Sequence, residues 1–180
     1  MSLPVTHALI PLASAFAFAK RPVPWKLVFV ASLAAAAPDL DALAHPLFGV
    51  AKESLYSHRG WTHSLFTALA VGCLAALCHR QFRLPALTVA VVVATAMASH
   101  GLLDMMTDSG KPVAYLWPLS SQRLFADWRP LPGTVRQFSY TLPAILNRVG
   151  AEMQLIFSIL VGASAIRMAR LGYTKAAGRK

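Results

Sequence analysis

Five apolar stretches separated by polar connections dominate the chain, at residues 1–19, 27–47, 61–77, 84–106 and 153–171. Each approaches the roughly 20 residues that a helix needs to cross the hydrocarbon core of a bilayer, so the pattern predicts five transmembrane helices. Basic residues follow the first stretch, at Lys20 and Arg21, and none precedes it. A cleavable signal peptide has the opposite order, so we expect this helix to be retained.

Composition supports the same class of protein. Only 13% of the residues are charged and 56% are hydrophobic, whereas a soluble domain is about 25% charged. The net charge of +10 comes from basic residues that punctuate apolar segments and do not gather in a nucleic-acid motif, so no nucleic-acid partner is expected. We predict an all-α, polytopic membrane bundle that forms a single domain over residues 1–180, with the lipid bilayer as its partner.

The long connection before the last helix has a different character. Residues 107–150 are rich in proline and contain the interfacial aromatic residues Tyr115, Trp117, Trp128 and Tyr140. Such residues are typical of the boundary between lipid and water. We expect an extramembrane cap with short amphipathic pieces on the bilayer, followed by the last transmembrane helix at 153–171 and a basic tail at 172–180.

Charges sort unequally between the two sides that five helices define. One side receives ten basic residues and no acid, and the other receives seven basic residues with all seven acids. The positive-inside rule then places the N-terminus outside and the C-terminus in the cytoplasm of an inner (plasma) membrane protein.

This orientation brings seven ionisable side chains from four segments to the same depth at the outer face. Such groups cost several kcal/mol each near apolar spans unless they are paired, hydrated or bound to metal, so we expect them to share one site. The candidate metal ligands are His7, Asp39, Asp41, His58, His63, His100 and Asp104.

Local spacing suits ligation. His100 and Asp104 are four residues apart and share one helix face, so one rigid element supplies two ligands. Asp39 and Asp41 follow Pro38, which suggests a broken helix end where one carboxylate binds metal and the other bridges or orients an imidazole.

Mixed imidazole and carboxylate donors favour zinc, manganese or iron, and seven candidates exceed the roughly four ligands of one zinc ion. One or two ions fit this set. Two would activate water for displacement at phosphorus, with Arg59 holding the phosphate and with Asp39 or Asp41 as general base where that residue is not a ligand.

Structural alternatives remain for several residues. Polar groups also act as hydrogen-bonded contacts between membrane helices, which is the simplest interpretation of His79 in its basic turn. His45, four residues after Asp41, suits either a metal ligand or a structural contact. Asp108 continues the helix face of His100 and Asp104, but no nearby residue in the sequence is spaced to pair with it.

Ordered sequence blocks resemble the YdjM-like family of predicted membrane-bound metal-dependent hydrolases. They are His7, Pro38-Asp39-Leu40-Asp41, His58-Arg59-Gly60-Trp61-Thr62-His63-Ser64, Ser99-His100-Gly101-Leu102-Leu103-Asp104 and Leu116-Trp117-Pro118. The resemblance implies a helical membrane fold, His and Asp ligands for a divalent metal, and hydrolase activity. The histidine after Asp41 comes later than in the family pattern, at His45.

We therefore expect a membrane hydrolase that cleaves a phosphoester in a lipid or lipid-linked substrate. A phosphatase with a phosphohistidine intermediate would need a Pro-Ser-Gly-His element, and an intramembrane metalloprotease would need His-Glu-x-x-His; the sequence has neither. A metal-handling or transport protein is the alternative from another class, and it predicts polar groups through both halves of the membrane.

Overall fold

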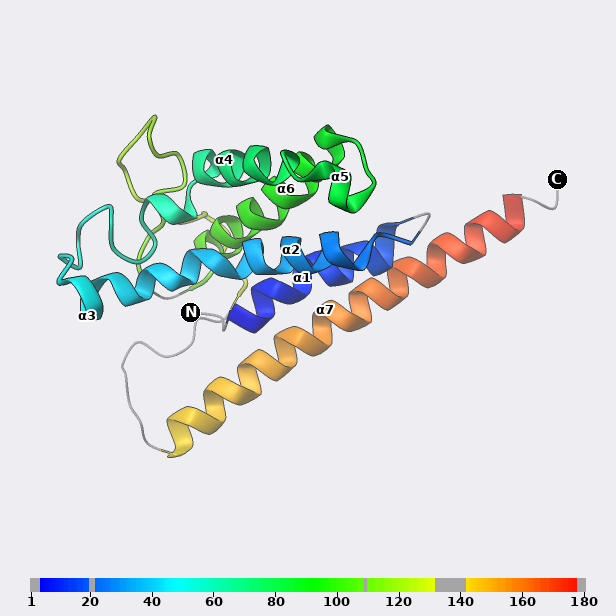
Figure 1. Ribbon diagram of the computed structural model, residues 1–180. Coiled ribbons are helices and arrows are strands. Elements are labelled where there is room, and N and C mark those ends of the chain that lie inside the picture. The colour runs from blue at the N-terminus through cyan, green and yellow to red at the C-terminus, as the bar shows by residue number, and fades with distance from the viewer. Residues whose placement is uncertain (1–3, 20–21, 109, 132–141, 178–180) are drawn as a thin grey trace.

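A computed structural model describes residues 4–19, 22–108, 110–131 and 142–177 (Figure 1). Within these ranges the regular elements are helices, and two isolated β-bridges join the loops. The helices are α1 (Pro4–Phe18), α2 (Trp25–Ala36), η1 (Ala37–Leu43), α3 (Ala44–Phe48), η2 (Trp61–His63), α4 (Leu65–Ala76), α5 (His79–Phe82), α6 (Ala86–Met105) and α7 (Leu142–Ala177). The predicted all-α bundle is confirmed.

The predicted spans map onto these helices. Three are long and apolar enough to cross a membrane, at Trp25–Phe48, Ala86–Met105 and Met153–Leu171. The other two, Thr6–Phe18 and Leu65–Ala76, are apolar but shorter than the roughly 20 residues of a full crossing. Helix α4 begins at Leu65 and not at the predicted position 61, because Trp61–His63 forms a separate 3₁₀ turn and Ser64 caps the helix by accepting from the Thr67 amide.

Helix α2 is followed directly by the 3₁₀ helix η1. The change of helix type occurs at Pro38, which has no amide hydrogen to continue the α-helical hydrogen bonds. Residues two apart lie about 160° apart around an α-helix but only about 120° apart around a 3₁₀ helix, given 3.6 and 3.0 residues per turn. The directions of Asp39 and Asp41 therefore differ less than they would on an α-helix, and both carboxylates approach His63.

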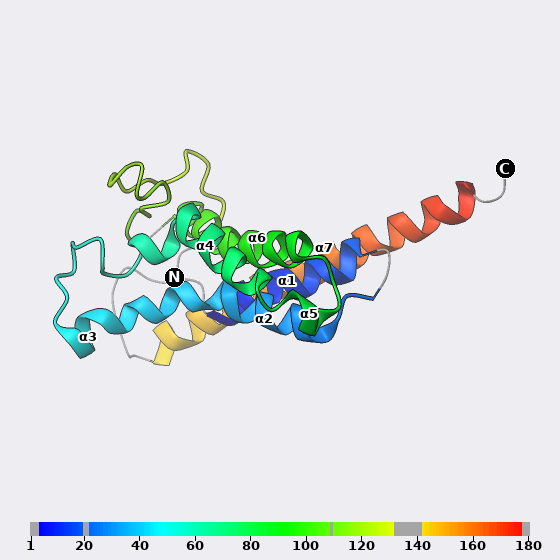
Figure 2. The same cartoon turned by 45° about the horizontal axis from the view of Figure 1, so that its top comes forward.

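Helix α6 is the centre of the bundle. It packs against both α2 and α4, while α1 covers α2 and α7 lies along α1 on the outside (Figures 1 and 2). The core between α2, α4 and α6 includes Leu27, Ala68, Val89 and Val93, all fully buried. This apolar core extends from the end of the bundle away from the site, at Leu27 and Val89, to Met97, within one helical turn of His100.

Two arginines attach α7 to α1. The side chains of Arg167 and Arg170 donate to the carbonyl oxygens of Phe16 (2.9 Å) and Ala17 (2.8 Å). These carbonyls belong to the last turn of α1, where a helix leaves its acceptors without internal partners. The C-terminal part of α7 therefore completes the end of α1.

The predicted cap differs from the structure. The predicted last span coincides with the apolar segment Met153–Leu171, but helix α7 begins earlier, at Leu142, and residues 110–131 form turns with no amphipathic helix among the described residues. Two loop bridges, Thr107 with Leu131 and Val113 with Leu124, hold this segment over the end of α6. Residues 132–141, with Tyr140, the basic pair Lys20 and Arg21, and the tail end 178–180 lie outside the described residues.

Close packing of α4 on α6 depends on Gly72. A Cβ atom there would lie 2.6 Å from the Ala90 carbonyl oxygen and 2.7 Å from the Ala94 Cβ. We predict that Gly72→Ala destabilises the protein by about 1–3 kcal/mol, as overpacking does, measured by unfolding in detergent. Gly162→Ala is the matched control, because a Cβ on that glycine of α7 meets nothing within 4 Å. Equal stability of the two variants would contradict this account.

Candidate metal centre

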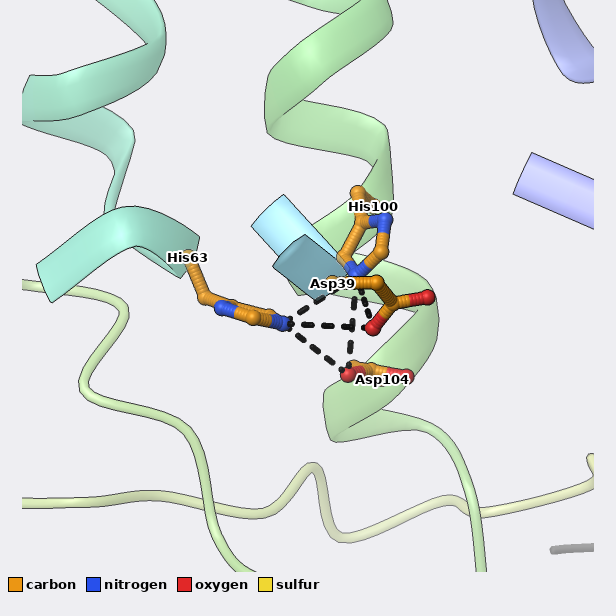
Figure 3. A group of neighbouring side chains, drawn as sticks. All are labelled: Asp39, His63, His100 and Asp104. Atoms are coloured by element: carbon orange, nitrogen blue, oxygen red, sulfur yellow. Dashed lines mark hydrogen bonds and ion pairs between the residues drawn. The ribbon is translucent and has the colours of Figure 1, made fainter. Parts of the chain in front are cut away.

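Four buried side chains from three elements converge at one end of the bundle. Asp39 comes from η1, His63 from η2, and His100 and Asp104 from α6 (Figure 3). One donor atom of each lies within 4.8 Å of the others. The sequence prediction that His100 and Asp104 share a helix face and meet residues from other segments is therefore met by the geometry.

Distances between the donor atoms suit a small cation. His63 Nε2 lies 3.1 Å from His100 Nε2 and 3.5 Å from Asp104 Oδ2, and His100 Nε2 lies 3.4 Å from Asp39 Oδ1. The remaining measured separations are 3.8 and 3.9 Å. Tetrahedral ligands at zinc bond lengths of about 2.0–2.2 Å lie about 3.3–3.6 Å apart. The cluster is close to this spacing before any ligand rearranges.

Hydrogen bonds fix which nitrogen of each imidazole faces the cluster. His100 Nδ1 lies 2.7 Å from the Ala35 carbonyl oxygen, and His63 Nδ1 lies 3.2 Å from Asp41 Oδ2. Both partners are acceptors, so each Nδ1 carries hydrogen and each neutral ring presents an Nε2 lone pair to the cluster. Two lone pairs 3.1 Å apart beside two carboxylates repel one another unless a proton or a metal cation lies between them.

Charge balance favours a divalent cation over a proton. The buried charges at this end are the carboxylates of Asp39, Asp41 and Asp104 and the guanidinium of Arg59. Their sum is two negative charges when all are ionised and the histidines are neutral. Since buried charge is costly unless it is compensated, a divalent ion among the four donors would neutralise the site. The residues present therefore fit a metal ion.

Asp41 orients two histidines and does not join the four donors. It accepts hydrogen bonds from His58 Nδ1 (2.6 Å), His63 Nδ1 and the Thr62 hydroxyl. Such carboxylate–histidine contacts fix the tautomer of a ligand and raise its basicity. Asp41, His58 and His63 form a second group close enough to hold an ion. A dinuclear centre stays a prediction.

His7 reaches the cluster from α1. Its ring stacks on His100 with centroids 3.7 Å apart, and its Nε2 lies 3.9 Å from Asp104 Oδ1. The carboxylate of Asp104 thus lies between His7 on one side and His63 on the other. All seven predicted ligands are at this end of the bundle, in a group of four and a group of three that share His63, with His7 beside them.

Arg59 is fully buried and holds Asp104. Its Nε lies 2.9 Å from Asp104 Oδ2, its Nη1 donates to the Lys111 carbonyl oxygen at 2.6 Å, and its Nη2 donates to the Thr107 hydroxyl at 3.2 Å. These contacts support a positioning role that joins the His-Arg-Gly motif to α6 and to the following loop. Its predicted role as a clamp for a substrate anion stays a prediction.

Backbone geometry explains the residues around the motif. Arg59 has φ of 65°, in the left-handed region that few side chains adopt, and the Gly60 position has no space for a Cβ atom next to the Leu55 carbonyl. On α6, a Cβ at Gly101 would collide with the His63 carbonyl oxygen. Gly101 therefore lets α6 approach His63 closely enough for His100 to meet it.

The remaining candidates lie apart from the cluster. His45 is exposed and its Nδ1 lies 2.8 Å from the Val50 carbonyl oxygen, while His79 contacts the Leu84 carbonyl oxygen in the turn after α4. Asp108 is exposed at the end of the α6 stripe. Outside the membrane-spanning segments, the hydrogen bond from Lys111 lowers the pKa of the Glu53 carboxyl and links two loops above the site.

Sequence reasoning missed several supporting groups. Thr62, Thr107 and the Ala35 carbonyl hold Asp41, Arg59 and His100 respectively. Thr62 lies inside the His-rich motif, so its position was a usable signal. Ala35 gave none, since any residue supplies a carbonyl.

The cluster makes a direct prediction about metal content. Protein purified in detergent is expected to contain a near-stoichiometric divalent metal by mass spectrometry, and His63→Ala and Asp104→Ala are expected to lose it, since each removes a donor atom. His79→Ala, which removes a histidine at the opposite end of α6, is the control and retains the metal. Wild-type protein that stays metal-free after reconstitution would contradict the assignment.

Asp41 supplies a second test. Asp41→Asn replaces one acceptor oxygen by an amide nitrogen, which cannot accept a hydrogen bond, so either His58 or His63 loses its partner. Changes to such outer partners typically weaken metal binding by about 10–100-fold. Competition with a zinc chelator measures the affinity, and Glu53→Gln is the control at an exposed carboxylate bound to Lys111. Equal affinities for Asp41→Asn and wild type would exclude this role.

Comparison with known proteins agrees with the membrane fold. The family model described as "YdjM inner membrane protein" matches residues 1–174. Inner membrane protein YbcI of Escherichia coli (strain K12) is 37% identical over 126 residues, which cover 69% of this chain and 72% of that protein. No solved structure matches the chain. The chain belongs to the YdjM family of inner membrane proteins.

Proposed function

We propose that this protein is a metal-dependent hydrolase of the inner membrane that cleaves a phosphoester in a lipid or lipid-linked substrate. The observation that carries the proposal is the buried group of two imidazole Nε2 atoms and two carboxylates at one end of the membrane helices. The metal is most simply zinc, with manganese or iron as further candidates for this donor set.

His63, His100, Asp39 and Asp104 would hold the ion, with His7 beside them. A divalent ion bound there supplies Lewis-acid polarisation of a phosphoryl oxygen and lowers the pKa of a water molecule. Because the donors come from three separate elements, tertiary packing sets their geometry before substrate arrives.

Asp39 would hold the ion through one oxygen and act as general base through the other. Its Oδ1 faces the cluster, and its Oδ2 is buried with no hydrogen-bond partner among the described residues. Both oxygens of Asp41, by contrast, already accept hydrogen bonds from His58, His63 and Thr62. In the proposed step Asp39 takes a proton from water, the water oxygen bonds to phosphorus as the bond to the leaving oxygen breaks, and Asp39 returns the proton to that oxygen, which leaves as the alcohol.

Location at the outer face is part of the proposal. The unequal distribution of basic residues supports an outward-facing site and a cytoplasmic C-terminus. Substrate lipid would then come from the outer leaflet, beside the loop that contains residues 110–131.

A transport protein for metal ions would need polar groups along a path through the membrane. The side chains packed in the bundle half away from the site are instead apolar, including Leu27, Val89 and Val93. This asymmetry favours a one-sided site and an enzyme.

Phosphoester hydrolysis tests the proposal. Zinc- or manganese-loaded protein in detergent is expected to release phosphate or alcohol from at least one member of a panel of lipid phosphates and phosphodiesters. At equal metal occupancy, Asp39→Asn is expected to lower turnover by about 10²–10⁴-fold, the usual contribution of a general base, while His79→Ala retains both metal and turnover. Metal-loaded protein that cleaves no phosphoester in the panel would contradict the proposal.

A further inference from the structure

A cavity of about 330 Å³ lies between α1, α2 and α6 and is separate from the donor atoms of the metal centre. Its floor is formed by the small buried side chains of Ala31 and Ala96, and its rim carries the exposed residues Ser14 and Thr95. Because the rim positions are exposed on membrane helices, the cavity opens sideways. We call it the α1–α6 groove.

The groove is apolar in effect although it contains hydroxyl groups. Thr95 donates to the Val91 carbonyl oxygen and Ser99 donates to the Ala96 carbonyl oxygen, both at 2.7 Å. Hydroxyls that bond to their own helix leave methyl and methylene groups facing the groove. The lining therefore suits hydrocarbon better than a polar ligand or water.

The groove comes within one helical turn of the metal centre on each of its three helices. Ile10 follows His7 by three residues, Ala31 precedes Ala35 by four, and Ser99 directly precedes His100. Four residues of helix rise about 6 Å. Since α1 runs opposite to α2 and α6, all three offsets point the same way, from the metal centre toward the middle of the membrane.

Its length suits one leaflet. On α6 the lining extends from Val92 to Ser99, which is about 10 Å of helix. Half of a hydrocarbon core of about 30 Å is about 15 Å. A neighbouring cavity of about 380 Å³ shares Ala15, Val23 and Val28 with the groove and continues it to Arg167 of α7.

We propose that the α1–α6 groove binds one hydrocarbon chain of a membrane lipid, with the headgroup of the same lipid at the metal centre. An amphiphile has an apolar chain and a polar headgroup, and the groove opens to the bilayer within one helical turn of a charged cluster. The inference that the headgroup is cleaved rests on the proposed function, whereas binding of the hydrocarbon chain does not require hydrolysis. The groove thereby selects substrates with a long chain attached to the phosphoester.

Photolabelling tests the occupant. Purified protein in detergent is irradiated with a phosphatidic acid that carries a diazirine within its acyl chain, and labelled peptides are identified by mass spectrometry. Label is expected on the segments of α1, α2 and α6 that line the groove. Ser14→Phe and Thr95→Phe fill the groove from exposed rim positions, where core packing is not disturbed, and each is expected to reduce this label at least five-fold.

Ala70→Phe is the matched control, because Ala70 is exposed on α4 and does not line the groove. It is expected to retain the label, and all three variants are expected to retain metal. Label spread evenly over exposed helix faces, or unchanged in Thr95→Phe, would overturn the proposal, and so would a groove protected from label by a second copy of the chain.

Hydrolysis measurements separate this proposal from the previous one. If the protein cleaves phosphoesters, Thr95→Phe is expected to raise KM for a long-chain lipid phosphate about ten-fold and to leave KM for a short-chain water-soluble analogue unchanged. Groove labelling without any hydrolysis would sustain chain binding and refute the hydrolase. Hydrolysis with equal KM effects on both substrates would refute the groove.

Discussion

Two imidazole nitrogens meet at 3.1 Å in the centre of the cluster, and each is held with its lone pair toward the other. The Ala35 carbonyl fixes His100 and the Asp41 carboxylate fixes His63, so neither ring can turn to relieve the repulsion without losing a buried hydrogen bond. In a low-dielectric interior this arrangement is expensive unless a positive charge lies between the rings. The two carboxylates at the same point make a divalent cation the simplest compensation.

Several features of the fold serve to hold that point in place. The 3₁₀ turn after Pro38 brings two carboxylates to one end of α2, and one of them faces the donors while the other orients histidines. Gly101 allows α6 to touch the backbone of His63. Arg59, in a left-handed conformation, ties Asp104 to the loop that follows α6. In each case the local backbone conformation allows polar side chains to meet at the end of the membrane helices.

The α1–α6 groove places an apolar cavity next to the polar cluster at the same end of the bundle. Small side chains on α2 and α6 leave space where larger ones would pack, directly below a cluster of buried charge. Polar chemistry and hydrocarbon binding then lie within one helical turn of each other. Such proximity is what a site for amphiphilic molecules requires.

Much of this was readable from the sequence. The apolar stretches gave five helices and the membrane class, because a bilayer demands about 20 apolar residues for each crossing. The spacing of His100 and Asp104 gave a shared helix face, and the rarity of charged groups marked the seven candidates. Helix ends were less accurate: α4 begins later than predicted and α7 begins earlier, because capping by Ser64 and the helical start at Leu142 carry weak hydropathy signals.

Which residues touch was decided by the tertiary structure alone. Hydropathy placed Asp39 and Asp41 at one depth, but only the 3₁₀ turn determined that Asp39 faces the donor cluster and Asp41 orients His58 and His63. The sequence likewise suggested an anion clamp for Arg59, whereas its contacts join it to Asp104, Thr107 and Lys111. Periodicity along a chain determines depth and helix face, because these follow from local backbone geometry. Pairings between residues far apart in the sequence depend on how helices pack and loops close, and no local pattern encodes that.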